Sequence, residues 1–325
     1  MPKVVVTDHS FDPLDVEQNI LQPLGVEFVG LQCKPAEQLA PQVVDADVVI
    51  TQFAQVNAMV IAGMKKARAI VRYGIGVDNV DLDAARERGI PVCNVPDYCI
   101  DEVADHTLAF ILGITRQVVS NCVHLRAGKW SLAVPLTELR TLKDQTVGVV
   151  GFGRIGREVV RRLLAFRARV KVTDPVLAAA DIEKAGAIPV RSVDELLPDC
   201  DILTLHCPSN ARTRRMIDGK ALAKIKRGAI LINLARGDLI DTAALIAALQ
   251  SGQLSAAALD VCDPEPIPPG HPLLQMPNVI VAPHIASASP RAVKRLREAV
   301  ATTAACALRG ETPPNIVNGV GPRGT

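Results

Sequence analysis

The sequence predicts an α/β protein with two doubly wound parallel sheets, and three observations support this fold class. The first hundred residues alternate short apolar runs with helical patterns. A glycine-rich turn follows near residue 151, and a second alternation runs on from it to residue 284. One helical pattern remains after that second alternation is complete. Alternating strands and helices are typical of parallel sheets covered by helices on both faces.

The first alternation predicts a small flavodoxin-like domain. Its predicted strands cover residues 4–7, 26–29, 48–51, 69–71 and 91–94. The fourth strand is followed directly by a glycine-rich loop at residues 73–78, which presents backbone N–H groups. Since ligands bind at the carboxyl edge of a parallel sheet, we expect this loop to take part in binding.

One long helix is predicted over residues 101–127. Apolar side chains recur there at i, i+3 and i+4 spacing. Asp101 and Glu102 suit the positive end of the helix dipole, and Gly128 favours its termination. We expect this helix to lead from the first domain into the second.

The glycine-rich turn lies at residues 146–156, where an apolar run leads directly into three glycines. Gly151 permits a tight turn, Gly153 lets the backbone approach a pyrophosphate, and Gly156 lets the helix pack closely on the strand. The N–H groups and positive end of the helix then face the anion. This pattern predicts a dinucleotide-binding turn made of Gly151, Gly153, Arg154, Ile155 and Gly156.

The segment after the turn favours NAD over NADP. Residues 157–166 predict an amphipathic helix, and residues 169–174 predict a strand that ends at Asp174. Asp174 lies about 20 residues after the glycines, where a carboxylate hydrogen-bonds the ribose hydroxyls and repels a 2′-phosphate. Residues 175–177 supply no Arg or Lys to neutralise that phosphate. We therefore predict NAD as the cofactor.

The remaining strand patterns complete a Rossmann domain. They cover residues 202–205, 229–233, 256–260 and 279–282, and a helix is predicted over residues 290–308. A helix left over after a complete dinucleotide domain indicates a return to the first domain. We therefore predict a Rossmann NAD-binding domain at residues 102–284, inserted into a flavodoxin-like substrate domain made of residues 1–101 and 285–325.

Composition narrows the functional class. Apolar residues make up 49% of the 325 residues, charged residues 22%, and the net charge is +2. This is ordinary usage for a globular protein, and no basic cluster indicates nucleic acid. The apolar stretches fall short of the roughly 18 residues that span a bilayer. We expect a cytoplasmic protein without a membrane partner, because the first residues enter a strand without a signal-peptide pattern.

The eight cysteines never form a C-x-x-C pair and lie within apolar patterns. We therefore interpret them as reduced, buried thiols. No His and Cys residues have metal-ligand spacing, so no metal site is predicted.

Three motifs in the second half carry the candidate chemistry. They lie at residues 233–238, 260–266 and 282–287, each after a predicted strand, so they converge at one carboxyl edge. Arg236 offers a planar fork of donors for a carboxylate. We also expect a helix to begin at Arg236, and because the helix dipole disfavours a cation there, an anion such as a substrate carboxylate is expected beside it. His284 suits proton transfer near neutral pH. Glu265 could accept a hydrogen bond from the other imidazole nitrogen and so fix the tautomer of the ring.

With these motifs, the sequence resembles the D-isomer-specific 2-hydroxyacid dehydrogenase family over nearly the whole chain. The family's acidic NAD-selecting residue is matched by Asp174, and its A-R-G-x-x-x-D arginine by Arg236. Its D-V-x-x-x-E-P glutamate is matched by Glu265, and its P-H-x-x histidine by His284. The resemblance implies an NAD-dependent oxidoreductase that interconverts a 2-oxo acid and a D-2-hydroxy acid. It also implies a homodimer, with the helix from Val103 and the loop near Trp130 as candidate interface.

The resemblance implies further site residues. The backbone of Tyr73, Gly74, Ile75 and Gly76 would grip the substrate carboxylate, with Arg72 lining the same pocket. Asp260 would hold the nicotinamide carboxamide. The cofactor cleft would be lined by Cys207, Leu234 and Ala235, and Thr107 would meet a cofactor phosphate.

Two alternatives stay open. Phosphoglycerate dehydrogenase is one, because residues 72–81 look like its substrate loop, although residues 130–139 add no cation for a phosphate. An NAD(H)-responsive scaffold is the other, because residues 94–99 and 102–105 resemble the C-terminal-binding-protein corepressors, although Ser287 replaces their tryptophan. Formate dehydrogenases fit poorly, since the resemblance implies glutamine at Glu265. The sequence does not select one substrate acid.

Overall fold

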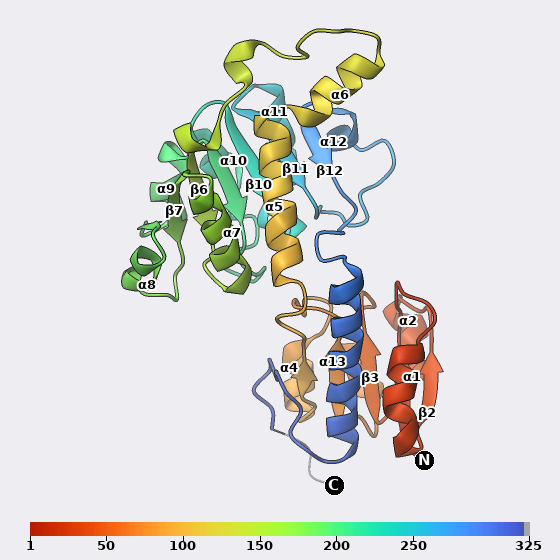
Figure 1. The fold of residues 1–325 in the computed structure, drawn as a ribbon. Coiled ribbons are helices and arrows are strands. Elements are labelled where there is room, and N and C mark those ends of the chain that lie inside the picture. The colour runs from red at the N-terminus through yellow and green to blue at the C-terminus, as the bar shows by residue number, and fades with distance from the viewer. Residues whose placement is uncertain (322–325) are drawn as a thin grey trace. The chain divides into compact units, whose positions relative to one another are not determined.

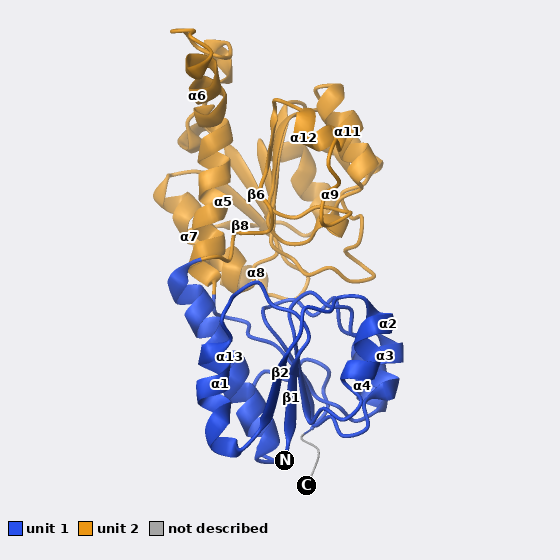
Figure 2. Ribbon diagram, turned by 90° about the vertical axis from the view of Figure 1, so that its right-hand side faces the viewer, with its two compact units in different colours: residues 1–98, 289–325 blue, residues 99–288 orange. Residues whose placement is uncertain are grey.

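The structure, a computed structural model, describes residues 1–321. The chain forms two compact units (Figure 2). Unit 1 contains residues 1–98 and the segment from Ser289 onward, and unit 2 contains residues 99–288. The boundaries predicted from sequence, after residues 101 and 284, lie a few residues from these positions.

Unit 1 is built on a five-stranded sheet in the order β2-β1-β3-β4-β5. Its strands are β1 (Lys3–Val6), β2 (Glu27–Gly30), β3 (Val48–Thr51), β4 (Ala69–Arg72) and β5 (Val92–Cys93). All of these pairs are parallel. The order is that of a flavodoxin-like sheet, so the predicted fold class of this unit is confirmed.

Helices cover both faces of the unit 1 sheet (Figure 2). They are α1 (Asp15–Leu21), α2 (Ala36–Leu39), α3 (Ala58–Gly63), α4 (Leu82–Glu87) and α13 (Pro290–Leu308), with 3-10 turns η1 (Gln22–Leu24) and η2 (Ala40–Gln42). Val4 and Val6 pack with the α1 and α13 side, while Val5 packs with the α2 to α4 side. This alternation explains why the strands are apolar at every position.

Unit 2 is built on a seven-stranded parallel sheet in the order β12-β11-β10-β9-β6-β7-β8. Its strands are β6 (Thr146–Val150), β7 (Arg169–Thr173), β8 (Ile188–Pro189), β9 (Ile202–Leu205), β10 (Ala229–Asn233), β11 (Leu254–Leu259) and β12 (Val279–Val281). The order reverses beside β6, which is the position at which doubly wound sheets bind their ligands. The predicted Rossmann sheet is confirmed, with one further strand, β8, at the edge beside β7.

The unit 2 helices also lie in two layers. They are α5 (Ile100–Thr115), α6 (Val118–Arg126), α7 (Arg154–Ala165), α8 (Ala179–Lys184), α9 (Val193–Leu196), α10 (Gly219–Lys224), α11 (Thr242–Gln250) and α12 (Pro272–Gln275), with 3-10 turns η3 (Leu136–Glu138), η4 (Leu142–Asp144), η5 (Leu197–Asp199) and η6 (Gly237–Leu239). Helices α5 and α7 lie side by side (Figure 1), while α10 and α11 pack with the core of the opposite face.

The prediction of one continuous helix over residues 101–127 is wrong. Helix α5 ends at Thr115, α6 begins at Val118, and their axes differ by 58°. Gln117 between them takes a left-handed backbone, with φ 54°. The apolar spacing continues through this bend, so periodicity did not reveal it. Within residues 1–321 no single helix is long and apolar enough to cross a membrane, although α5 and α6 meet that criterion as a bent pair.

Candidate active site

The structure brings the three candidate motifs to one edge of the unit 2 sheet. Arg236 follows β10, Glu265 follows β11 and His284 follows β12, and these strands are neighbours in the sheet. Because the strands are parallel, the loops after them share the carboxyl edge. The same edge carries the glycine turn, which follows β6.

His284 and Glu265 form a hydrogen-bonded pair. The Nδ1 atom of His284 lies 2.6 Å from Oε1 of Glu265. The second oxygen, Oε2, accepts a bond of 3.3 Å from the backbone N–H of Cys262. Burial raises the pKa of Glu265, but the bond to His284, the charges of His284 and Arg236 and the Cys262 amide together hold this pKa below its usual value. Glu265 is therefore a carboxylate at neutral pH.

Asp260 fixes the backbone that carries His284. His284 has a left-handed backbone, with φ 53°, and its N–H donates to the Asp260 carbonyl at 2.8 Å. The Asp260 carboxylate is buried and accepts the N–H groups of Ile285 and Ala286, each at 2.9 Å. A strained backbone persists only where neighbouring groups fix it. Sequence reasoning assigned Asp260 to the nicotinamide and missed this bracing of the loop.

The expectation that Arg236 begins a helix is wrong. Arg236 precedes the three-residue turn η6, and helix α11 begins only at Thr242, capped by Asp241. The helix-dipole argument for an anion at Arg236 therefore fails. Arg236 is placed instead by local bonds, since its Nη1 donates to the Ala235 carbonyl at 2.7 Å and its own carbonyl accepts from Asn233 Nδ2 at 2.8 Å.

Gly237 lets the Arg236 loop lie directly against the loop of Glu265. A Cβ atom at Gly237 would lie 2.0 Å from the carbonyl oxygen of Cys262. Only glycine permits this approach of two backbones. The approach explains why the Arg236 charge contributes to the lowered pKa of Glu265.

The glycine turn fits a dinucleotide phosphate. Gly151 has φ 97°, and a Cβ atom there would lie 2.5 Å from the His206 carbonyl oxygen. At Gly156 a Cβ atom would lie 2.2 Å from the Gly151 carbonyl oxygen, so this glycine lets α7 approach the turn. At Gly153 nothing lies within 4 Å of a Cβ position. The turn thus has two tight glycines and one open glycine, beside the amino end of α7 where Arg154 and Ile155 begin the helix.

Asp174 is held against the glycine turn. Its Oδ2 accepts the N–H of Phe152 at 2.7 Å, and its Oδ1 accepts those of Val176 and Leu177 at 2.9 and 3.2 Å. The carboxylate therefore joins the turn after β6 to the end of β7. Its predicted contact with the ribose hydroxyls stays a prediction, and no sequence pattern indicates these amide bonds.

Three predicted lining residues lie on neighbouring loops of unit 2. Cys207 follows β9, and burial raises the pKa of its thiol to about 11, so it is uncharged at neutral pH. Leu234 is buried and Ala235 partly exposed, both directly after β10. Burial also lowers the pKa of the neighbouring His206 to about 4, which leaves that ring neutral.

Thr107 fits its predicted role poorly. It lies in the second turn of α5 rather than at the helix start, and its side chain is fully buried. Its hydroxyl donates to the Val103 carbonyl at 2.8 Å. A phosphate needs a donor, and the single hydroxyl proton of Thr107 is already used.

The loop in unit 1 has fewer amides available than predicted. The N–H of Tyr73 donates to the Thr51 carbonyl at 2.8 Å, and that of Gly74 donates to the Arg72 carbonyl at 2.9 Å. Of the four amides predicted to bind the carboxylate, those of Ile75 and Gly76 make no such bond within residues 1–321. The Arg72 guanidinium crosses Gly74 so closely that a Cβ atom there would lie 1.5 Å from Nη1.

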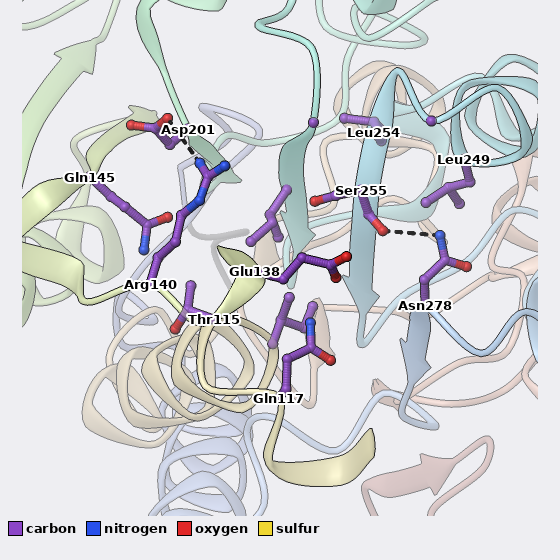
Figure 3. A pocket seen from close by; sticks show the side chains of 14 residues that line it. Thr115, Gln117, Glu138, Arg140, Gln145, Asp201, Leu249, Leu254, Ser255 and Asn278 are labelled. Atoms are coloured by element: carbon purple, nitrogen blue, oxygen red, sulfur yellow. Dashed lines mark hydrogen bonds and ion pairs between the residues drawn. The ribbon is translucent and has the colours of Figure 1, made fainter. Parts of the chain in front are cut away.

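A cavity of about 370 Å³ lies elsewhere in unit 2 (Figure 3). Its lining includes Asp201, Gly228 and Asn278, which immediately precede β9, β10 and β12, so it lies at the amino edge of the sheet. Arg140 reaches Asp201 across it at 3.8 Å, and Asn278 donates to the Ser255 carbonyl at 3.0 Å. None of the predicted site residues lines this cavity. The chemistry of His284 and Glu265 therefore belongs to the opposite edge.

No metal-binding group of three or more His, Cys, Asp or Glu side chains is present within the part of the chain that the structure describes. The residues that fit a bound group are those of the glycine turn and Asp174.

Comparisons with known proteins agree with this fold and turn. The family model described as D-isomer specific 2-hydroxyacid dehydrogenase, NAD binding domain, matches residues 108–286. A glyoxylate reductase of Korarchaeum cryptofilum is 38% identical over 280 residues, which cover 85% of this chain and 84% of that protein. A D-3-phosphoglycerate dehydrogenase of Mycobacterium leprae is 38% identical over 322 residues, which cover 98% of this chain but only 59% of that longer protein.

Among solved structures, D-lactate dehydrogenase from Aquifex aeolicus, complexed with NAD and lactic acid, superposes with a TM-score of 0.88. It is 28% identical, and the match covers 97% of this chain and 99% of that one. The matched family model spans the glycine turn, Arg236, Glu265 and His284. The chain therefore belongs to the D-isomer specific 2-hydroxyacid dehydrogenase family, and it is an NAD-dependent oxidoreductase that acts at a CH–OH group.

Proposed function

We propose that the protein interconverts a 2-oxo acid and a D-2-hydroxy acid, with His284, Glu265 and Arg236 as the acting residues. The observation that carries this proposal is the bond of 2.6 Å between His284 Nδ1 and Glu265 Oε1 at the carboxyl edge of the NAD-binding sheet. A histidine oriented by a carboxylate is the arrangement that proton transfer to or from a substrate oxygen requires.

His284 is the proposed acid and base. Since the Glu265 carboxylate accepts from Nδ1, that nitrogen keeps its proton and Nε2 is the atom that exchanges a proton with substrate. In reduction, Nε2 gives its proton to the oxygen that was the ketone, and Glu265 stabilises the ring while it is charged. In oxidation, Nε2 takes the hydroxyl proton. The chemistry that the cofactor supplies when bound is hydride transfer.

Arg236 is the proposed anchor for the substrate carboxylate. Its guanidinium has five donors, and the bond to the Ala235 carbonyl uses Nη1 at 2.7 Å. A carboxylate paired with this planar fork of donors would be fixed in orientation, which places the neighbouring carbonyl carbon for reaction. We further propose that the loop of Arg72 to Gly76 binds a substrate carboxylate through its Ile75 and Gly76 amides.

Gly151, Gly153, Arg154, Ile155 and Gly156 are the proposed holders of the pyrophosphate. Asp174 is proposed to bind the ribose hydroxyls and to disfavour the extra phosphate of NADP. Asp260, Cys207, Leu234 and Ala235 are proposed to line the rest of the cofactor site. Thr107 is proposed to contact a cofactor phosphate, but it is the weakest of these assignments because its hydroxyl proton is already donated to the Val103 carbonyl.

The stereochemical part of the proposal is tested by oxidation of paired enantiomers. Purified protein with NAD⁺ should oxidise the D form of a 2-hydroxy acid, and the L form should give no turnover above background. Equal turnover of both enantiomers would contradict an ordered site with fixed positions for carboxylate and hydroxyl.

A phosphorylated substrate is the second candidate. The match to the phosphoglycerate dehydrogenase of Mycobacterium leprae covers 98% of this chain, which favours it. The two candidates separate in a direct comparison of kcat/KM for phosphohydroxypyruvate and for glyoxylate. A phosphate must be bound by cations, so a preference for phosphohydroxypyruvate that fades with added salt would support the second candidate.

We also propose that the protein is a cytoplasmic homodimer. Helix α6 and the loop after it expose Val118, Val123 and Trp130, the last with 90% of its surface accessible. Exposed apolar side chains concentrated in one segment are typical of protein interfaces, and a two-fold axis would cover them with the same segment of a second copy. All eight cysteines are free thiols, which suits a reducing compartment.

A further inference from the structure

A buried ion pair lies beneath the loop of Arg72 to Gly76 in unit 1. Glu17 of α1 is fully buried, and Arg297 of α13 is nearly so. Nε of Arg297 donates to Glu17 Oε1 at 2.9 Å, and Nη2 donates to Oε2 at 2.7 Å. Nη2 also donates to the Pro13 carbonyl at 2.6 Å and to Asp15 at 3.0 Å. The guanidinium therefore holds two charged partners and the backbone before α1.

Tyr73, the residue that begins the turn of the loop, is part of this network. Its hydroxyl donates to Glu17 Oε1 at 2.9 Å, and only 1% of its surface is accessible. Its ring meets Phe11 edge-on, with centroids 5.0 Å apart. Burial and the Glu17 charge raise the pKa of Tyr73, so its hydroxyl keeps its proton at neutral pH.

Stability alone is a weak reason for such a network. Removing two charges from water costs about as much as their attraction returns, and apolar side chains of similar volume often stabilise a core equally well. What the hydrogen bonds among these side chains add is a single fixed arrangement of the groups that they join. Here that geometry ends at the backbone of Tyr73, whose N–H is also held by the Thr51 carbonyl at 2.8 Å.

The loop beyond Tyr73 needs a fixed starting point. Gly74 has φ 141° and Gly76 has no side chain, so both leave the backbone free to rotate. On its far side the loop is held by Asn94 Nδ2, which donates to the Ile75 carbonyl at 2.6 Å, and by the Val95 N–H, which donates to the Gly74 carbonyl at 3.0 Å. The peptide groups that carry the Ile75 and Gly76 amides are thus held through their own carbonyl oxygens, and the Tyr73 side chain holds the residue before them.

We propose that Tyr73 is a positioning residue, held by Glu17 and Arg297, which preorganises the Ile75 and Gly76 amides for the substrate carboxylate. This inference rests on the proposed function, because it takes that loop to bind the carboxylate. Amides that are already aligned bind an anion without an ordering cost, so the network would act on substrate affinity rather than on hydride transfer.

The test is Tyr73→Phe, which removes one oxygen and keeps the ring. We expect KM for the preferred 2-oxo acid to rise roughly fivefold, which corresponds to the loss of one hydrogen bond. We expect kcat and the Kd for NADH to stay within about twofold, since neither depends on this loop. Arg297→Lys keeps the charge but loses the forked bond to Glu17, so it is the second variant and should raise KM in the same way.

Arg68→Met is the matched control. Arg68 pairs with Asp47 at 3.3 Å and donates to the Leu308 carbonyl at 3.1 Å, so it ties the last residue of the same helix α13 to the residues before β3 and β4. The control should lower Tm and leave KM unchanged. Equal rises of KM in Arg68→Met and Tyr73→Phe would show a general loss of packing and overturn the proposal.

Asn94→Ala separates this inference from the function beneath it. It removes the bond that holds the Ile75 carbonyl and should also raise KM. A raised KM in Asn94→Ala with an unchanged KM in Tyr73→Phe and Arg297→Lys would refute the network's role while the loop's role stands. Unchanged KM in all three variants would refute both the positioning role of the network and the role of the loop in binding the carboxylate. A wild-type protein without turnover on any 2-oxo acid would contradict the proposed function, and this inference with it.

Discussion

At the scale of single residues, two acidic side chains, Asp260 and Glu265, fix the position of His284. His284 takes a left-handed backbone, and Asp260 fixes it through one carbonyl and two carboxylate bonds. Glu265 then fixes the ring through Nδ1. Both acids act on the same histidine from different sides, one through the backbone and one through the side chain. The proposed proton-transfer atom, Nε2 of His284, is thereby placed before substrate arrives.

Replacement of His284 tests that atom. His284→Gln keeps a polar side chain of similar reach but cannot exchange a proton, so kcat should fall at least about a hundredfold. The Kd for NADH, from quenching of protein fluorescence, should change by less than about twofold. His124→Gln is the control, since His124 is a half-buried histidine of α6 whose ring bonds Ser131 Oγ at 2.9 Å. A kcat near that of the wild type would exclude His284 as the acid.

Glu265 predicts a pH dependence of stability. Its pKa is lower in the folded protein than in the unfolded chain, so its stabilising contribution is present above the unfolded pKa and is lost as pH falls through the folded pKa. The side chain is partly exposed, so this contribution is at most about 1 kcal/mol. The difference in free energy of unfolding between wild type and Glu265→Gln, from urea titrations, should shrink from neutral pH into acid. A difference that grows in acid would contradict the pairing.

At the scale of elements, the glycine turn offers two variants with opposite expectations. Gly156→Ala places a Cβ atom 2.2 Å from the Gly151 carbonyl oxygen and should destabilise the protein by roughly 1–3 kcal/mol. Gly153→Ala places its Cβ in open space with a permitted φ of −70°, so its Tm should stay near that of the wild type. Both should weaken NADH binding, since the proposed pyrophosphate lies against Gly153.

Thermal unfolding and NADH titration of the two variants check this difference. Gly153→Ala is the informative variant because its effect on binding is separated from any effect on folding. Unchanged NADH affinity in a well-folded Gly153→Ala protein would place the phosphates elsewhere.

The elements also show where sequence patterns stop being sufficient. Strands at residues 48–51, 202–205 and 229–233 and the helix at residues 290–308 have the predicted bounds, because a continuous apolar run or a proline start defines them. The bend at Gln117 was not predicted, since a left-handed glutamine has no sequence signal. The short turn after Arg236 was not predicted either, because helical propensity resumes only a few residues later.

At the scale of the whole molecule, the fold was predictable and the bonds inside the site were not. Alternation and three glycines are local patterns, and they determine two parallel sheets by general rules. The Tyr73 side chain, by contrast, points to Glu17, which is distant in sequence, and the Asp174 oxygens are taken by amides of two different loops. Such contacts depend on tertiary packing, which no short pattern encodes.

The proposed homodimer is a prediction at this scale. Val123→Glu places a charge on α6 at a side chain that is 60% exposed, and it should convert a dimer to a monomer because burying an unpaired carboxylate is costly. Val176→Glu is the control, at an even more exposed valine outside that helix. Light scattering after size exclusion gives the mass. A wild-type monomer at micromolar concentration would contradict the proposal directly.

The most direct test of the central claim is the rate of NADH oxidation with a panel of 2-oxo acids. The panel includes glyoxylate, hydroxypyruvate, phosphohydroxypyruvate, pyruvate and branched-chain oxo acids, with NADPH as the cofactor control. We expect clear turnover of at least one acid with NADH, a much lower rate with NADPH, and loss of that turnover in His284→Gln. Tight NADH binding with no turnover of any acid would contradict it and would favour a scaffold that binds NAD(H) without catalysis.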